Sequence, residues 1–208
     1  MRFYLARHAE TAWNREGRYQ GRRESSLSEL GERQARALGG ALRERNITRI
    51  ISSPLQRCVA TAAPLANELG LAVERDEMLT EIAHGTWETR LRDEIAANDR
   101  ARFSAWRSAP WSVRFDQGES LADVLARWRS FRTAFEPRGD TLVVTHDVVV
   151  RVALIELLQM DPEAFWNLRV RNAAFAEFEC RAPRWRLVDE CVDAHVAEML
   201  ADASLQAL

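Results

Sequence analysis

Short runs of consecutive apolar residues alternate along this chain with segments whose apolar residues recur every three or four positions. Runs without polar alternation are typical of strands buried on both faces of a parallel sheet, and they occur at about 3–6, 47–52, 71–74 and 141–145. The periodic segments predict amphipathic helices at about 28–42, 54–69, 121–135 and 147–159. Two further β-like runs and a short amphipathic helix follow after residue 173. Strands that alternate with helices predict an α/β sheet with helices on both faces.

Capping residues indicate where several of these helices begin and end. The predicted starts are Ser28, Ser53 followed by Pro54, and a capping box formed by Ser120 and Asp123. Gly70 predicts the end of the second helix, because glycine readily adopts the left-handed conformation found there.

Residues 90–118 are charged and irregular in pattern. We expect them to belong to a small capping insertion, at about 84–118, over the ligand-binding edge of the sheet. Trp106 and Trp111 lie in this region, and two interpretations of them stay open. They either pack the cap onto the sheet or contact a ligand, because loops over a rigid scaffold often set specificity. The whole chain, 1–208, is expected to form a single domain.

Composition excludes several classes of protein. No apolar run approaches the roughly 20 residues of a membrane span, and the N-terminus opens directly into a predicted strand rather than a signal peptide. Cys58, Cys180 and Cys191 have no metal-like spacing, which favours reduced thiols in a cytoplasmic protein. The net charge of -2 argues against a nucleic-acid partner. Residues 1–57 nevertheless hold 12 arginines and 6 acidic residues, which fits a small anionic ligand.

Two of the predicted strands end directly in histidine. The first strand is followed by Arg7 and His8, and the fourth by His146. Because ligands bind beyond the carboxyl ends of strands in open α/β sheets, both histidines are expected at one edge. Arg57 lies in the first turn of the helix after the second strand, beside its positive end. Guanidinium groups bind phosphate in bidentate fashion, so this edge is a candidate phosphate site.

Three segments together resemble the histidine phosphatase superfamily, the phosphoglycerate mutase-like enzymes. They are the run from Arg7 to Thr11, where Ala9 replaces the usual glycine of Arg-His-Gly-Glu-Thr, the segment 52–62, and the segment 143–151. They occur in family order at family-like spacing, and the resemblance spans about residues 3–195. It implies a three-layer α/β/α sandwich with a mostly parallel central sheet and a small capping insertion.

The resemblance also implies a set of catalytic residues. These are His8 as the nucleophile, Arg7 and Arg57 as the two arginines that clamp the phosphate, His146 as a second phosphate-contacting histidine, and Glu81 as the proton donor. Phosphoryl transfer then proceeds without a metal, since the sequence contains neither an Asp-rich cluster nor a P-loop. We therefore expect no cofactor. His84 and Glu88 are alternatives for the acid.

Four more residues are candidates for substrate binding. Asn14, Gln20 and Gly21 match positions of the family's first loop. Asp147 stands where the family usually has glycine, and two interpretations of it are open. Its carboxylate either caps the following helix or faces the site, where it could meet a positively charged part of the substrate.

The sequence thus predicts a metal-independent phosphomonoesterase of the small phosphatase branch. It would hydrolyse a small phosphorylated metabolite through a phosphohistidine intermediate, with neither nucleic acid nor membrane as partner. The first alternative is a 2,3-bisphosphoglycerate-type phosphoglycerate mutase, and the second is a noncatalytic phospho-ligand binding module. The oligomeric state stays open, with a homodimer among the possibilities.

Overall fold

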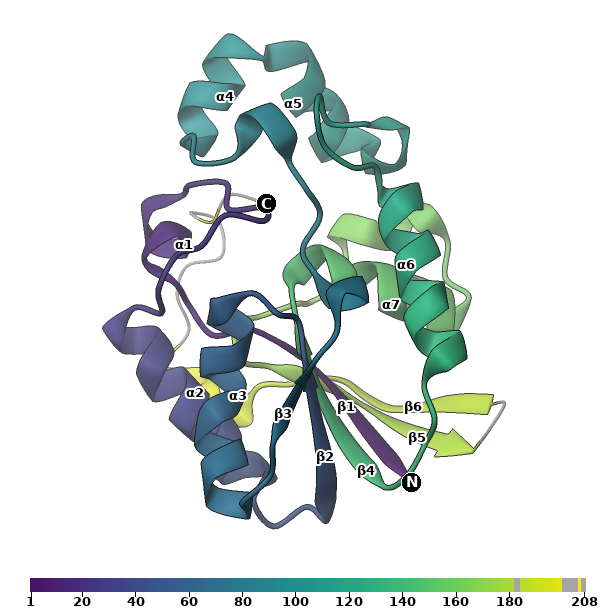
Figure 1. Cartoon of the computed structure of the whole chain (residues 1–208). Helices are drawn as coiled ribbons and strands as arrows, with labels where there is room; N and C mark the ends of the chain where they lie inside the picture. The colour runs from purple at the N-terminus through teal and green to yellow at the C-terminus, as the bar shows by residue number, and fades with distance from the viewer. Residues whose placement is uncertain (182–183, 200–205, 207–208) are drawn as a thin grey trace.

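The computed structural model describes residues 1–181, 184–199 and 206. At its centre is a six-stranded sheet with the strand order β3-β2-β4-β1-β5-β6 (Figure 1). The strands are β1 (Arg2–Arg7), β2 (Ile47–Ser52), β3 (Val73–Arg75), β4 (Asp140–Thr145), β5 (Phe175–Arg181) and β6 (Arg184–Val192). The first four pair in parallel, and β5 runs antiparallel to both β1 and β6. The sheet is therefore mixed, and the parallel strands β4 and β1 are its two central strands.

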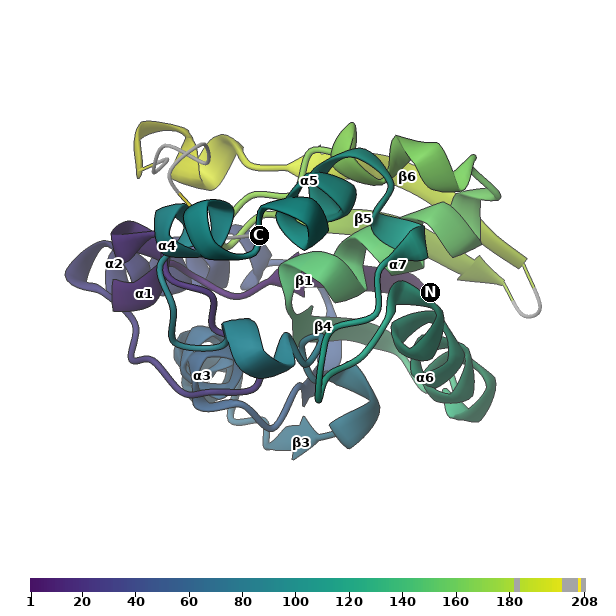
Figure 2. The same ribbon diagram turned by 90° about the horizontal axis from the view of Figure 1, so that it is seen from above.

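Helices cover both faces of the sheet, as the alternating pattern predicts (Figures 1 and 2). One face is covered by α2 (Glu29–Leu42), α3 (Gln56–Leu69) and the 3₁₀ helix η5 (Ala194–Met199), and the other by α6 (Leu121–Ala134) and α7 (Asp147–Leu158). Successive residues of β1 point to opposite faces. Phe3 and Leu5 pack in the core with α6 and α7, whereas Tyr4 and Ala6 pack with α2 and α3. This double burial explains why the strand shows no polar alternation, and the predicted α/β architecture is confirmed.

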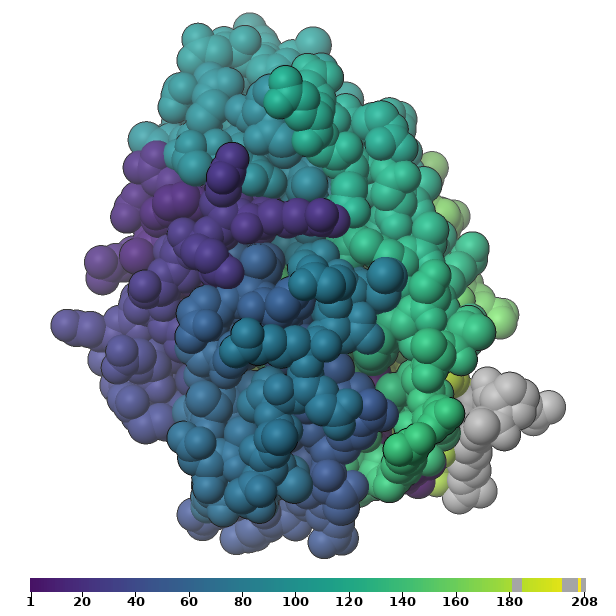
Figure 3. Space-filling model, in the orientation of Figure 1, coloured from purple at the N-terminus to yellow at the C-terminus, as the bar shows by residue number. Residues whose placement is uncertain are grey.

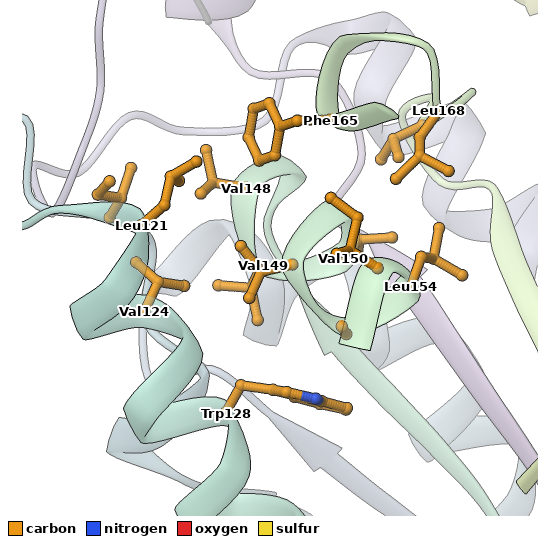
Figure 4. Packing of buried hydrophobic residues seen from close by; sticks show 14 of the residues in the cluster. Leu121, Val124, Trp128, Val148, Val149, Val150, Leu154, Phe165 and Leu168 are labelled. Atoms are coloured by element: carbon orange, nitrogen blue, oxygen red, sulfur yellow. The ribbon is translucent and has the colours of Figure 1, made fainter. Parts of the chain in front are cut away.

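The α6–α7 pair forms a dense part of the core (Figure 4). Leu121, Val124 and Trp128 of α6 face Val148 and Val149 of α7, and all five are fully buried. Because α7 begins directly after His146, this packing fixes the end of β4 and the side chains that follow it.

The cap consists of residues 84–118 and lies over the carboxyl ends of the parallel strands (Figure 1). It contains η2 (Gly85–Trp87), α4 (Arg92–Asn98), α5 (Arg100–Ser108) and η3 (Pro110–Ser112). The sequence pattern of this region is irregular, although the region contains the two helices α4 and α5. Each of these short helices buries a single residue, Ile95 in α4 and Trp106 in α5, so neither produces a periodic apolar stripe.

Most predicted helix boundaries are confirmed, but one start signal is wrong. Ser28, the Ser120–Asp123 capping box and Gly70 act as predicted. Helix α3 begins at Gln56 rather than Pro54, with Leu55 at its N-cap position, and the Ser53 side chain is hydrogen-bonded to His146. The remaining elements are α1 (Ala12–Glu16), η1 (Glu77–Leu79) and η4 (Pro162–Trp166). Among the helices that the structure describes, none has the length and apolar character of a membrane span.

Candidate active site

The two histidines at the strand ends lie side by side. Arg7 is in register with Thr145 across the parallel β1–β4 pair, and the His8 backbone N–H donates to the Thr145 carbonyl at 2.9 Å. The ring centroids of His8 and His146 are 5.2 Å apart, with an interplanar angle of 66°. Both side chains are buried. The sheet edge therefore joins two residues that are 138 positions apart in the sequence.

The ring of His8 is held with one nitrogen available for reaction. Its Nδ1 lies 2.7 Å from the carbonyl oxygen of Ala9. A carbonyl only accepts hydrogen bonds, so Nδ1 carries the proton and Nε2 carries the lone pair. Burial, together with the charges of Arg57 and Arg7, holds the pKa of His8 well below its usual value. The imidazole is consequently neutral.

The backbone around His8 is fixed by groups from distant parts of the chain. The His8 carbonyl accepts hydrogen bonds from the Asn172 side chain at 3.0 Å and from the Ala173 N–H at 3.3 Å. The Ala9 N–H donates to the Thr61 hydroxyl at 2.9 Å. Such second contacts determine how accurately a reacting side chain is placed.

His146 is neutral as well, with the opposite proton placement. Arg57 Nε donates to His146 Nδ1 at 3.2 Å, and His146 Nε2 lies 2.8 Å from the Ser53 hydroxyl. Nδ1 is thus the acceptor and Nε2 the donor. Burial, followed by the charge of Arg57, holds the pKa of His146 well below its usual value. The sequence-based expectation that a bound phosphate raises this pKa stays a prediction.

Backbone carbonyls of the 20–23 loop hold the guanidinium of Arg57. Nη1 donates to the Arg23 carbonyl at 2.8 Å, and Nη2 donates to the Gly21 carbonyl at 2.7 Å. Gly21 has a positive φ of 52°, and a Cβ atom there would lie 2.1 Å from Glu88 Oε1. The backbone conformation therefore favours glycine at this position, and any other residue would displace the end of the Glu88 side chain.

Arg7 is buried and is held mainly by groups from later in the chain. Nη1 donates to the Val170 carbonyl at 3.2 Å and lies 3.1 Å from Asp147 Oδ2, while Nη2 donates to Gln206 Oε1 at 2.6 Å. Nε has no hydrogen-bond partner among the described residues. Burial lowers the pKa of Arg7, and the carboxylate of Asp147 opposes that shift. Two buried guanidinium groups thus lie beside the histidine pair.

Glu81 has the protonation behaviour of a general acid. It is 6% exposed, and burial raises its pKa to about 7, against the opposing hydrogen bond from the Ile82 N–H at 2.9 Å. The negative charge of Asp147 adds to the increase. The segment before Glu81 is attached to the end of β4 by a 2.7 Å hydrogen bond from the Thr145 hydroxyl to the Leu79 carbonyl. A carboxyl group with this pKa is partly protonated at neutral pH.

The two alternatives for the acid differ from Glu81 and from each other. His84 is buried, and neither ring nitrogen has a hydrogen-bond partner among the described residues. Burial, helped by the charge of Arg57, lowers the pKa of His84 to about 3, which leaves no proton to give at neutral pH beyond the neutral N–H. Glu88 Oε1 accepts hydrogen bonds from the backbone N–H groups of Arg22 and His84 at 3.1 Å each. Glu88 therefore links the 20–23 loop to the cap.

Two of the predicted substrate-binding side chains, Asn14 and Asp147, have contacts of their own. Asn14 Oδ1 accepts from the backbone N–H of Thr11 at 3.1 Å, within the capping box of α1. Gln20 is buried, and its Oε1 has no partner in the part of the chain that the structure describes. Asp147 is the first residue of α7 and does not cap it, because its carboxylate is paired with arginines. The capping interpretation of Asp147 is therefore wrong.

Sequence reasoning missed four residues that support this site: Ser53, Thr61, Asn172 and Gln206. Thr61 follows Arg57 by four residues and so shares its helix face, and this spacing could have been recognised in the sequence. Asn172 and Gln206 carry no local signal, since their contacts with His8 and Arg7 span 164 and 199 positions. Within residues 1–181, 184–199 and 206, no three His, Cys, Asp or Glu side chains are grouped to hold a metal ion.

Comparison with known proteins places the site in a family context. The family model described as histidine phosphatase superfamily (branch 1) matches residues 3–192. The chain is 33% identical over 206 residues to phosphoserine phosphatase 1 of Hydrogenobacter thermophilus, covering 98% of each protein. It is 31% identical over 188 residues to a probable phosphoglycerate mutase of Erwinia tasmaniensis, covering 89% of this chain and 87% of that one. The solved structure of YhfR from Bacillus stearothermophilus superimposes with a TM-score of 0.87 at 29% identity, covering 94% of this chain and 98% of the other.

Proposed function

We propose, from the premise that this chain belongs to the histidine phosphatase superfamily, that it hydrolyses a small phosphate monoester through a phosphohistidine at His8. Family membership and phosphatase relatives make it a phosphoric monoester hydrolase. The observation that carries the mechanism is the neutral ring of His8, whose lone pair lies on Nε2 because Nδ1 donates to the Ala9 carbonyl. A neutral imidazole is a competent nucleophile toward phosphorus.

In the first step, His8 Nε2 attacks the phosphorus atom and the bond to the leaving oxygen breaks. The departing alkoxide takes the proton of Glu81, whose raised pKa keeps that proton available near neutral pH. Arg7 and Arg57 stabilise the negative charge on the equatorial oxygens of the phosphoryl group. The products are an alcohol, a phosphorylated His8 and an ionised Glu81.

In the second step, a water molecule attacks the phosphorus of phosphohistidine on the side that the alcohol has left. The carboxylate of Glu81 accepts a proton from this water, which restores its acid form. The P–N bond breaks, the electron pair returns to His8 Nε2, and inorganic phosphate is released. The cycle consumes one water and one ester, and it needs no further reactant.

The charges of the buried groups match a phosphomonoester dianion. Arg7, Arg57 and Arg151 are buried cations, Asp147 is a buried anion, and the two histidines are neutral. With Glu81 in its acid form, these groups carry two net positive charges, which a dianion neutralises. A buried charge is costly unless it is balanced, so the site favours monoesters over singly charged diesters.

For the substrate we propose a small phosphorylated hydroxy acid, with phosphoserine as the first compound to test. Support comes from the relative named phosphoserine phosphatase 1, which this chain matches over 98% of both lengths. A second support is His84, three residues after Glu81, whose neutral ring has no partner among the described residues. An imidazole N–H could donate to a carboxylate or hydroxyl of the leaving group.

The test is a substrate panel measured in the presence of EDTA. Phosphoserine, 3-phosphoglycerate, sugar phosphates and p-nitrophenyl phosphate are compared by phosphate release, with His8→Ala as the control. We expect hydrolysis by the wild type, with a base-stable and acid-labile phosphoenzyme trapped after rapid quenching. Absence of the phosphoenzyme in an active wild type, or full activity in His8→Ala, would contradict the mechanism.

A phosphoglycerate mutase is the second candidate, because one relative carries the name probable phosphoglycerate mutase. A mutase must keep its phosphohistidine long enough to phosphorylate a second hydroxyl group. Transfer of label from 2,3-bisphosphoglycerate to 3-phosphoglycerate, faster than phosphate release, would favour this candidate over the phosphatase.

A further inference from the structure

Asp147 is a buried carboxylate between two buried arginines. It is 1% exposed, with Oδ1 2.5 Å from Arg151 Nε and Oδ2 3.1 Å from Arg7 Nη1. The contact with Arg7 is an ion pair, since Oδ2 accepts no hydrogen bond from the described residues. Each carboxylate oxygen therefore faces a different guanidinium group. A carboxylate is taken out of water at such a position only when cations compensate it.

Arg151 is itself held firmly. Its Nη1 donates to the carbonyls of Phe165 and Leu168 at 2.8 Å each, and its guanidinium lies over the rings of Phe165 and Trp166. The segment that follows α7 thus fixes Arg151, Arg151 fixes Asp147, and Asp147 contacts Arg7. The same segment contacts Arg7 directly through the Val170 carbonyl.

These contacts argue against the other interpretation of Asp147 from the sequence, in which its carboxylate meets a positively charged part of the substrate. A positively charged group of the substrate would have to replace Arg7 or Arg151 as the partner of the carboxylate. Burial already lowers the pKa of Arg7, and Arg7 would then also lose the anionic neighbour that opposes this shift.

We propose that Asp147 is a positioning residue that orients the guanidinium of Arg7, with Arg151 as its fixed counter-charge. This inference rests on the proposed function of the same site. A guanidinium is planar, so contacts at Nη1 and Nη2 determine where its Nε–H points. In Arg7, Nε is the nitrogen that has no partner among the described residues. Asp147 therefore orients the Nε–H so that it can donate a hydrogen bond to a phosphoryl oxygen.

Arg151 explains why a carboxylate is tolerated beside a phosphate site. Without Arg151, the charge of Asp147 would repel the substrate dianion and oppose Arg7. Arg151→Gln should consequently raise the KM for every phosphate ester. Asp147→Asn should mainly lower kcat, because Arg7 keeps its charge but loses its orientation.

The decisive experiment measures Asp147→Asn with two substrates, p-nitrophenyl phosphate and phosphoserine. Only phosphoserine carries an ammonium group. Positioning through Arg7 predicts equal losses of kcat/KM on both, on the order of 10- to 100-fold. A loss confined to phosphoserine would mean that Asp147 contacts the ammonium group, and it would overturn the proposal.

A double-mutant cycle tests whether Asp147 acts through Arg7. In the Arg7→Ala background, Asp147→Asn should change kcat/KM by less than about 3-fold, because there is no guanidinium left to orient. A loss as large as in the wild-type background would refute the positioning role. Glu156→Gln is a matched control, since Glu156 is a carboxylate on α7 that pairs with Arg132 at 2.9 Å. It should leave activity unchanged.

Two further measurements keep the test decisive. If Asp147→Asn fails to fold, Asp147→Asn combined with Arg151→Gln removes both charges together and should show the same substrate-independent loss. If the wild type hydrolyses no ester, the proposed function fails. The double-mutant cycle is then repeated with vanadate affinity, measured by calorimetry, in place of kcat/KM. Additive effects of Arg7→Ala and Asp147→Asn on that affinity would overturn the inference independently.

Discussion

Apart from Arg7 Nε and Asp147 Oδ2, the buried polar groups described above at the sheet edge are hydrogen-bonded to one another or to the backbone, whereas His84 in the cap is surrounded by aromatic rings. Arg57, His146 and Ser53 form a continuous hydrogen-bonded chain at the sheet edge. The ring of His84 lies 4.9 Å from Tyr19 and 4.8 Å from Phe115 between centroids, and its nitrogens have no partner among the described residues.

This contrast indicates that the sheet edge and the cap have different roles. Fixed charges and hydrogen bonds suit a reaction centre that every phosphate ester shares, because the transition-state charge is the same for all of them. An unpaired polar group costs stability, and it is retained where a ligand can pair with it. The sheet edge should therefore control rate on all substrates, and the cap should control the choice among them. Figure 3 shows part of the N-terminal segment, in purple, directly below the cap, in teal, on one face of the molecule.

The largest effect should come from His8→Ala at the sheet edge. Removing the proposed nucleophile should lower kcat on the order of 10⁴-fold or more, on activated and unactivated esters alike. Phosphate release and circular dichroism together separate this loss from unfolding. A loss restricted to one class of ester would break the proposed division between the two regions.

Glu81→Gln, at the junction of the two regions, should have a leaving-group-dependent effect. Alkyl phosphates should lose on the order of 10²- to 10³-fold, and p-nitrophenyl phosphate much less, because its leaving group needs no proton. Since the pKa of Glu81 is raised to about 7, wild-type kcat on alkyl esters should fall as the pH rises through that value. The variant should lack this alkaline limb. An unchanged limb in Glu81→Gln would assign the titration to another group.

His84→Phe should alter selectivity more than rate. On phosphoserine we expect a loss of about 10-fold in kcat/KM, with p-nitrophenyl phosphate changed by less than about 3-fold. Removing two unpaired buried nitrogens should also leave Tm unchanged or raise it by a few degrees. A parallel loss on both substrates, or a lower Tm, would make His84 a packing residue of the cap.

The smallest effect is expected for Trp111→Phe. Trp111 Nε1 donates to the Pro162 carbonyl at 2.9 Å, so the change removes one exposed hydrogen bond between the cap and η4. The free energy of unfolding should fall by about 1 kcal/mol, with the substrate ranking unchanged. Thermal unfolding and the same substrate panel measure both. A changed ranking would restore the idea that this tryptophan contacts substrate.

Much of the sheet edge could be predicted because strand ends and helix starts are local signals. The apolar runs locate the ends of β1 and β4, and parallel pairing brings His8 and His146 together without further information. The pair of Asp147 and Arg151 was also readable, since residues four apart meet on a helix face. Its meaning was not, because the carboxylate also contacts Arg7 from another strand end.

The cap was harder to predict for a physical reason. Trp106 packs against Phe115, Phe165 and Trp166, two of which lie beyond α7, so its burial depends on contacts far away in the sequence. Short helices with one buried residue give no period to detect. Trp106 is fully buried, which supports the packing interpretation for that residue.

The two backbone carbonyls that accept hydrogen bonds from Arg57 affect which mutations this protein can tolerate during evolution. The atoms that hold Arg57 belong to the main chain at Gly21 and Arg23, so they are present whatever side chain stands at position 23. The Arg23 side chain is 70% exposed, and its ion pair with Glu88 Oε2 at 3.5 Å is a surface contact of little energetic weight, so position 23 should tolerate substitution. One inserted or deleted residue in this loop would move both carbonyls at once. Libraries that randomise position 23 should therefore retain active clones, whereas libraries that alter the length of the loop should yield almost none.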